Sequence, residues 1–183
     1  MVTQRTKQLV VVMLVGTLLP GCSASLHRAE IGLASPVTNW EGLTKLFRSG
    51  KVYFGGQPTP DGLRTARERG IKVVVNLRSA GEVAALEFDE PALVAQLGMR
   101  YVSIPVTSAT FGPSHADRLK TVLSETPGPV LIHCASSNRV GAVWALYLYR
   151  HRDVPLADAI EHGRSAGLSS ETLINAVKRA AAR

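Results

Sequence analysis

Three short runs of apolar residues, rich in β-branched side chains, follow one another along the chain after residue 39. The runs Ile71–Leu77, Arg100–Val106 and Val130–His133 predict strands, and the first and third are continuous enough to be buried on both faces. A fourth run, Val52–Gly56, is shorter and closes with two glycines. It predicts an edge strand.

Between these strands, apolar positions recur at the three- and four-residue spacing of helices. Thr59 and Pro60 suit the N-cap and first position of a helix that ends at Gly70. Ser114–Asp117 has the spacing of a capping box, with Asp in place of Glu or Gln, and predicts a helix to about Ser124. Further helices are predicted at 83–97 with an interruption near Pro91, at 140–150, at 156–163 and at 170–181.

This alternation predicts an α/β fold: a single, mostly parallel sheet flanked by helices on both faces. Sheets of this kind bind their ligands at the carboxyl ends of the strands. Three segments should therefore share one edge of the sheet: Arg78, the loop at 107–113, and the residues after His133.

The first 22 residues have a different pattern. Basic residues precede the apolar stretch Leu9–Leu19, which is too short to span a membrane comfortably, and Pro20-Gly21-Cys22 follows. This segment resembles a bacterial lipoprotein signal peptide in which Cys22 is the lipidated residue. The resemblance implies export and a lipid anchor in a membrane facing the periplasm or the cell exterior, with the outer membrane favoured in a Gram-negative host. A secretory signal without lipid and an uncleaved anchor are the alternatives.

We therefore divide the chain into a signal peptide at 1–22, a tether of small and polar residues at 23–38, and one domain at 39–183. The whole chain of 183 residues is 45% hydrophobic, which is enough for a core. The formal net charge of the chain, +7, favours anionic partners. The Lys and Arg residues are scattered, so no nucleic-acid partner is expected. Two cysteines with separate roles predict neither a disulfide framework nor a metal site.

The residues after the third strand carry the chemistry. Cys134 follows His133, four short side chains come next (Ala135, Ser136, Ser137 and Asn138), and Arg139 begins a helix. A tight loop that enters a helix directs backbone N–H groups at one point, and the helix N-terminus adds positive partial charge. Arg139 offers a planar fork of donors that fits phosphate oxygens. Such surroundings favour the thiolate of a cysteine and suit nucleophilic phosphoryl transfer, although a buried cysteine at a strand end is often inert.

His-Cys, a short loop and Arg resemble the cysteine phosphatase superfamily. The segments 54–58 (Phe-Gly-Gly-Gln-Pro), 74–78 (Val-Val-Asn-Leu-Arg), 104–106 (Ile-Pro-Val) and 133–134 resemble, over about 39–168, the dual-specificity-like bacterial family of beta-lactamase-hydrolase-like phosphatases. The resemblance implies a phosphatase without metal or other cofactor, acting on a phosphorylated substrate. Cys134 would be the nucleophile and Arg139 the phosphate clamp. The backbone from Ala135 would form the cradle, and His133 would orient it.

The chain departs from the superfamily pattern at several positions. The superfamily usually has five residues between the cysteine and the arginine. This chain has four between Cys134 and Arg139, as do this bacterial family and the rhodaneses. Ser137 replaces a glycine, which predicts a strained loop, and Val140 replaces a hydroxyl residue that aids turnover.

The loop at 107–113 also lacks the usual acid. Asp117 and His115 are the nearest candidates for it, and both also suit the first turn of a helix. We expect low activity on poor leaving groups. Arg78 is a candidate substrate contact or a surface salt bridge.

Two further hypotheses remain beside the phosphatase. The four-residue loop also suits a rhodanese-like sulfurtransferase, in which the cysteine carries a persulfide. Ser137, Val140 and the missing acid favour a lipoprotein that binds phosphorylated ligands without turning them over.

Overall fold

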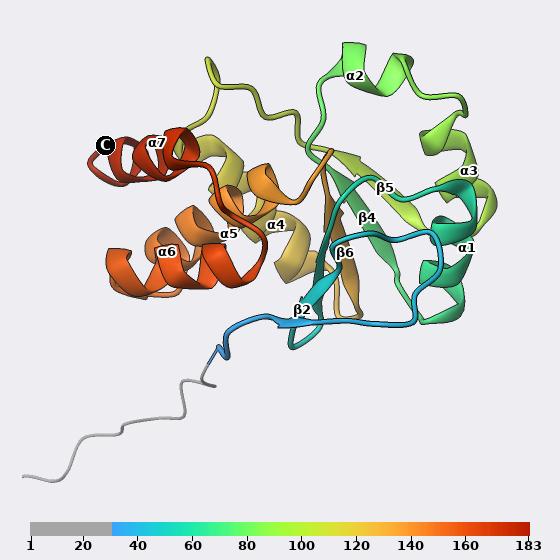
Figure 1. Cartoon of the computed structure of the whole chain (residues 1–183), viewed down its shortest axis with the longest axis horizontal. Coiled ribbons are helices and arrows are strands. Elements are labelled where there is room, and N and C mark those ends of the chain that lie inside the picture. The colour runs from blue at the N-terminus through green and yellow to red at the C-terminus, as the bar shows by residue number, and fades with distance from the viewer. Residues whose placement is uncertain (1–30) are drawn as a thin grey trace, which may run out of the picture. The chain divides into compact units, whose positions relative to one another are not determined.

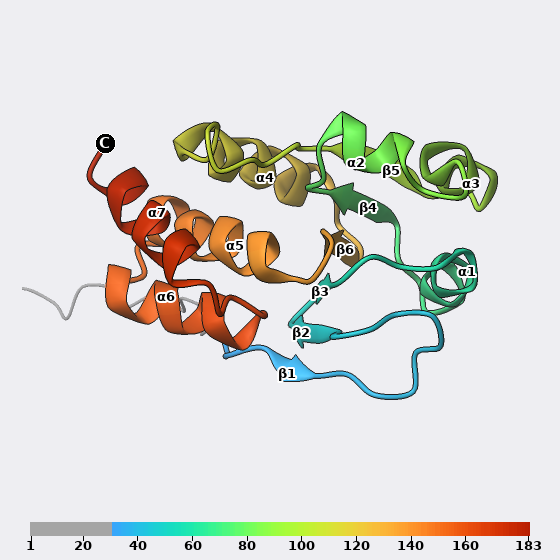
Figure 2. The ribbon, with the colours of Figure 1, turned by 45° about the horizontal axis from the view of Figure 1, so that its top comes forward.

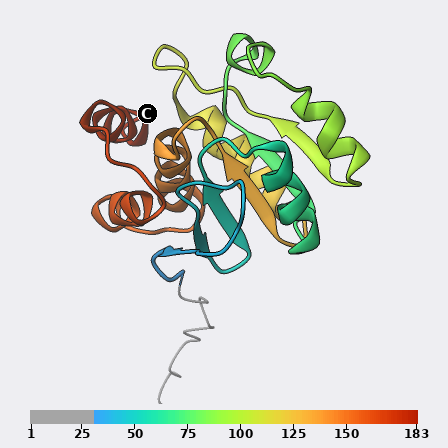
Figure 3. The same cartoon turned by 45° about the vertical axis from the view of Figure 1, so that its right-hand side comes forward.

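The computed structural model describes residues 31–183. Within them, four parallel strands form the centre of the fold. Strand β6 lies at the middle of the sheet between β3 and β4, and β5 forms one edge (Figures 1 and 3). Every residue of β4 and β6 is buried, which explains their uninterrupted apolar sequences. The bounds are β3 (Val52–Gly55), β4 (Val73–Asn76), β5 (Arg100–Ser103) and β6 (Val130–His133).

The other edge of the sheet consists of two short antiparallel strands, β1 (Ser35–Pro36) and β2 (Phe47–Ser49). They correct two predictions. The strand that begins at Val52 is internal, because β2 pairs with it on the outer side. The predicted tether 23–38 is too long at its carboxyl end, because Ala34 packs against the core and β1 joins the sheet. An outermost strand needs hydrogen bonds on one side only and tolerates proline, so its sequence resembles a linker.

Helices cover both faces of the sheet (Figure 2). On one face α5 (Asn138–His151) packs against α4, α6 and α7, and on the other α1 packs against α3. Side chains alternate accordingly: Ile132 belongs to the core under α5, whereas Leu131 belongs to the core under α1. The predicted α/β class is confirmed. The remaining bounds are α1 (Pro60–Glu68), α3 (Glu90–Gln96), α4 (Pro113–Glu125), α6 (Leu156–Ser165) and α7 (Glu171–Ala181).

Local signals located some helix ends correctly and others wrongly. Thr59 caps α1 by accepting a hydrogen bond from the backbone N–H of Gly62 at 3.1 Å. The segment predicted as one helix at 83–97 is two, α2 (Ala80–Ala84) and α3, and Pro91 lies in the first turn of α3 rather than at the break. The predicted capping box at 114–117 is wrong, because Gly112 is the N-cap of α4.

The four parallel strands end at the same level. Gly55 and Asn76 both pair with His133, and Asn76 also pairs with Ser103. The loops that follow these strands therefore meet at one edge of the sheet, as predicted. The predicted signal peptide and Cys22 lie outside the described residues. Within residues 31–183, no helix has the length and apolar character needed to cross a membrane.

Candidate active site

The loop 134–138 is positioned by the neighbouring strand β3 and the two glycines at its end. Cys134 is a free cysteine, 1% exposed, and its backbone N–H donates to the carbonyl of Gly55 at 3.3 Å. Gln57 in turn donates its N–H to the carbonyl of Ala135 at 3.4 Å. A Cβ atom on Gly56 would lie 3.3 Å from that same carbonyl oxygen. The absence of a side chain at Gly56 thus lets the two segments run side by side.

Ser137 has the strained conformation that its sequence position predicts. Its φ of 69° lies in the left-handed region, where a glycine is the usual residue. The buried hydroxyl donates to the carbonyl of Ala166 at 2.8 Å, and a Cβ on Gly167 would lie 2.7 Å from the Cβ of Ser137. The segment between α6 and α7 therefore both anchors Ser137 and leaves room for it.

Asn138 also faces this segment rather than the mouth of the loop. Its Oδ1 accepts the backbone N–H groups of Ser169 at 2.8 Å and Ser170 at 2.9 Å. These bonds fix the start of α5, from which Arg139 projects.

Arg139 is held in a fork by Glu82 of α2. Nη1 and Nη2 of Arg139 donate to the two carboxylate oxygens at 2.8 and 2.7 Å, and Nη1 also reaches the carbonyl of Val106 at 3.2 Å. The hydrogen bond with Arg139 lowers the pKa of Glu82 from its usual 4.5 to about 2. The pKa of Arg139 is raised by Glu82 first and also by Cys134. The guanidinium is thus held by a fixed carboxylate and lies close enough to Cys134 to interact with it electrostatically.

Glu82 was not among the site residues predicted from the sequence, although a local signal for it exists. Ser79 and Glu82 form a capping box: the N–H of Ser79 donates to Oε2 of Glu82 at 2.9 Å, and the N–H of Glu82 donates to the Ser79 hydroxyl at 3.3 Å. The capping box orients the carboxylate before Arg139 reaches it.

A buried polar network lies beneath the loop. Nε2 of His133 is 3.1 Å from Oε1 of Glu90, and both side chains are fully buried. Glu90 also accepts from Gln57 at 3.0 Å and from Asn76. Burial raises the pKa of Glu90, but its interaction with His133 and its hydrogen bonds from the two amide donors outweigh burial and lower the pKa. An ionised Glu90 therefore fixes the ring that precedes Cys134.

Arg78, the candidate substrate contact, belongs to the same network. Its Nη1 donates to Oε1 of Gln57 at 2.6 Å, and its backbone N–H donates to Oδ1 of Asn76 at 2.7 Å. Its Nε lies 3.6 Å from Oε1 of Glu82. Arg78 thus links the two carboxylates of the site, and its contact with substrate stays a prediction.

Both predicted acid candidates have structural partners, and their role as the acid stays a prediction. His115 is 6% exposed, and its ring nitrogens lie 3.2 Å from the backbone N–H of Gly112 and 3.1 Å from the carbonyl of Pro105. Asp117 accepts from His151 at 2.8 Å, and His151 lies twelve residues beyond Arg139 on α5, about 18 Å along the helix axis. His115 thus lies in the first turn of α4, and Asp117 binds that helix to α5.

Comparisons with known proteins agree with this geometry. Residues 31–176 match the family model described as DSP-PTPase phosphatase fused to NAD+ kinase. The chain is 28% identical over 98 residues to the beta-lactamase hydrolase-like protein of two strains of Xylella fastidiosa, a match that covers 52% of this chain and 23% of the relative. It thus spans about a quarter of the length of these curated relatives.

Solved structures of other proteins share the fold. A cysteine-to-serine variant of Pseudomonas aeruginosa TpbA in complex with phosphotyrosine superposes with a TM-score of 0.63 at 20% identity, over 85% of this chain and 91% of that one. Tk-PTP in its active form superposes with a TM-score of 0.64 at 20% identity, over 79% and 99%. The match of the family model over most of the chain shows that this protein belongs to the family of DSP-PTPase phosphatase domains described as fused to NAD+ kinase.

Proposed function

We propose that this protein is a metal-independent cysteine phosphatase that hydrolyses phosphate monoesters, with aryl phosphates as its preferred substrates. One observation carries the proposal: a buried cysteine and an arginine locked by Glu82 meet at a loop that runs into the N-terminus of α5. The backbone N–H groups of 135–139 would bind the phosphate oxygens, and Arg139 would clamp them.

The reaction proceeds in two displacements at phosphorus. The thiolate of Cys134 attacks, the S–P bond forms, and the P–O bond to the leaving group breaks. The leaving group departs with the electron pair and takes a proton from solvent. Water then attacks the phosphocysteine, breaks the S–P bond, and releases inorganic phosphate and the thiolate.

Phosphotyrosine or a similar aryl ester is the substrate class that the site favours. The two carboxyl groups in contact with Arg139 and His133 both have a lowered pKa, so neither Glu82 nor Glu90 holds a proton to donate. A phenol leaves with less protonation than an alkyl alcohol. TpbA, which shares the fold, was solved with phosphotyrosine bound.

Hydrolysis of p-nitrophenyl phosphate by the full-length chain tests the proposal, with reductant and a metal chelator present. We expect chelator-resistant turnover that Cys134→Ser abolishes. Retention of full activity by that variant would refute the mechanism.

A second candidate is a phosphate-binding protein without turnover, which Val140 favours because it follows Arg139 where a hydroxyl would assist release of the thiolate. Binding of vanadate without hydrolysis would support this candidate. Transfer of sulfur from thiosulfate to cyanide by a chain that hydrolyses no phosphate ester would favour a sulfurtransferase instead.

We also propose that the protein is exported and anchored by lipid on Cys22, so that it acts on phosphorylated substrates at a membrane surface facing the periplasm or the cell exterior. The support is the lipobox-like sequence Leu19-Pro20-Gly21-Cys22 after an apolar stretch. Metabolic labelling with a fatty acid, followed by membrane fractionation, tests it. The wild type should carry label in the membrane fraction and Cys22→Ala should not. Equal labelling of both would contradict the proposal.

A further inference from the structure

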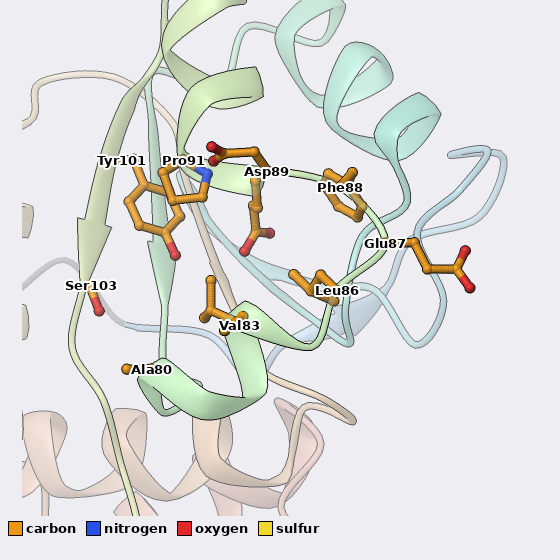
Figure 4. Close-up of a pocket in the computed structure, with 11 residues that line it drawn as sticks. Ala80, Val83, Leu86, Glu87, Phe88, Asp89, Pro91, Tyr101 and Ser103 are labelled. Carbon is orange, nitrogen blue, oxygen red and sulfur yellow. The ribbon is translucent and has the colours of Figure 1, made fainter.

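A pocket of about 710 Å³ lies at the β5 edge of the sheet, beside the segment that joins α2 to α3 (Figure 4). We call it the edge pocket. Its lining includes the larger apolar or aromatic residues Val83, Leu86, Phe88, Pro91 and Tyr101. A volume of this size accommodates a large side chain with its neighbours.

The rim of the edge pocket is acidic, although the chain as a whole has a formal net charge of +7. Glu87 and Asp89 line it and are both exposed, and its described lining contains no lysine, arginine or histidine. Figure 4 shows the carboxylate of Glu87 directed away from the apolar side chains. A cationic group beside an apolar side chain would find a partner there, whereas an anionic one would be repelled.

Helix α2 separates the edge pocket from the catalytic loop. Glu82 of this helix binds Arg139 at 2.7 Å, while the next residue, Val83, lines the pocket. A helix with its side chains is about 10 Å across, and an extended chain advances about 3.3 Å per residue. A peptide with its phosphate at Cys134 would therefore reach the edge pocket with the third or fourth residue beyond the phosphorylated one.

The base of the edge pocket touches the network under the loop. Glu90 lines it and lies 3.1 Å from His133. Burial, and then the charge of Glu90, raise the pKa of Tyr101 to about 12, so its hydroxyl keeps its proton even in alkaline solution. A ligand seated in the pocket would thus lie next to groups that position His133, the residue before Cys134.

We propose that the edge pocket is a substrate subsite. It binds a large apolar side chain, next to a lysine or arginine, three or four residues from the phosphotyrosine of a phosphorylated protein. This inference rests on the proposed phosphatase function and adds to it a sequence preference in the substrate.

Phosphotyrosine peptides that differ only at those positions test the inference, with p-nitrophenyl phosphate as a substrate too small to reach the pocket. A Leu-Lys peptide should have a kcat/KM about tenfold above a Gly-Lys peptide, the scale expected for burying one large apolar side chain. It should exceed a Leu-Glu peptide by about threefold, as expected for an exposed charge pair.

Two variants locate the effect. Phe88→Ala should reduce the advantage of Leu over Gly, and Glu87→Lys should reverse the preference between Lys and Glu. Glu68→Lys, which alters an exposed carboxylate on α1, is the matched control. Turnover of p-nitrophenyl phosphate should be unchanged in all three.

The outcomes separate this inference from the proposed function. Normal hydrolysis of p-nitrophenyl phosphate with equal kcat/KM for all peptides, or a preference that both pocket variants retain, would overturn the subsite alone. If the wild type hydrolyses nothing, the phosphatase proposal fails, and peptide affinity measured by fluorescence anisotropy takes the place of kcat/KM. Equal affinity for the peptide with and without its phosphate would mean a docking site for another partner and would overturn the subsite.

Discussion

Replacing Glu82 with glutamine isolates the contribution of the carboxylate that holds Arg139. The carboxylate accepts two N–H groups from the guanidinium, at 2.7 and 2.8 Å. Glutamine offers one acceptor oxygen and turns an NH₂ group toward the donors of Arg139. It can still complete the capping box with Ser79, since Gln serves that motif as well as Glu does. Helix α2 should therefore persist while the fork is lost.

The expected fall in kcat/KM follows from the type of hydrogen bond between Glu82 and Arg139 and from its exposure to solvent. A hydrogen bond to a charged group contributes about 1.5–3 kcal/mol. The Glu82 side chain is 34% exposed, so solvent screening reduces the figure to about 1–2 kcal/mol. If that energy is lost where Arg139 meets the phosphoryl group, kcat/KM for p-nitrophenyl phosphate should fall by about 5- to 30-fold. Glu68→Gln, with the same chemical change at an exposed site, should leave it unaltered. A Glu82→Gln enzyme within about twofold of wild type would refute the reasoning.

The same variant should change the response of stability to acid. Arg139 lowers the pKa of Glu82 to about 2 in the folded protein, against a usual 4.5. Because the folded pKa lies below the unfolded one, ionised Glu82 stabilises the fold above pH 4.5, and this contribution is lost as the pH falls toward 2. The free energy of unfolding in urea should thus decrease more steeply over that interval in wild type than in Glu82→Gln. Parallel pH profiles would show that the fork does not stabilise the fold.

Three further predictions concern the loop, its supporting helix and the leaving group. Ser137→Ala should cost about 1 kcal/mol in the free energy of unfolding, because the bond to Ala166 is lost while the positive φ remains; Ser137→Gly should cost less, because it relieves the strain. Gly141→Ala should destabilise severely in thermal unfolding, since its Cβ would meet the carbonyl oxygen of Gly163 at 2.4 Å; Gly81→Ala, in open space on a helix, should stabilise by about 0.5–1 kcal/mol. Across a series of substituted phenyl phosphates, kcat/KM should fall steeply as the pKa of the leaving phenol rises, and a shallow dependence would reveal an acid among the residues of the site.

The centre of the fold was predictable because its signals are local. Continuous apolar runs located β4 and β6, and the cap at Thr59 located the start of α1. The sheet edge was not predictable for the same physical reason. β1 contains a serine and a proline and is held by backbone pairing with β2, so its place depends on a partner strand rather than on its own side chains.

The same distinction between local and distant signals applies to the candidate site. The loop from Cys134 to Arg139 is contiguous in sequence, and its strand–loop–helix context predicted an anion cradle. Glu82 lies 57 residues before its partner Arg139, and Glu90 lies 43 residues before its partner His133. No periodicity in the sequence links residues so far apart. The predicted acid candidates at 115 and 117 follow β5 in the chain, whereas the carboxyl groups that contact Arg139 and His133 come from α2 and α3.

These carboxylates also determine how the site attracts phosphate. The positive charges of Arg139 and Arg78 are offset by the ionised Glu82 and Glu90, so the charged side chains of this group contribute little net charge. The attraction for a phosphate dianion must then come mainly from the backbone N–H groups of the loop and the N-terminus of α5, which act at short range and only in the correct geometry. That geometry depends on the strained Ser137 and its anchor on the segment after α6. The affinity for phosphate should accordingly be more sensitive to the conformation of the loop than to ionic strength, because Arg139 aligns the phosphoryl group while the loop backbone binds it.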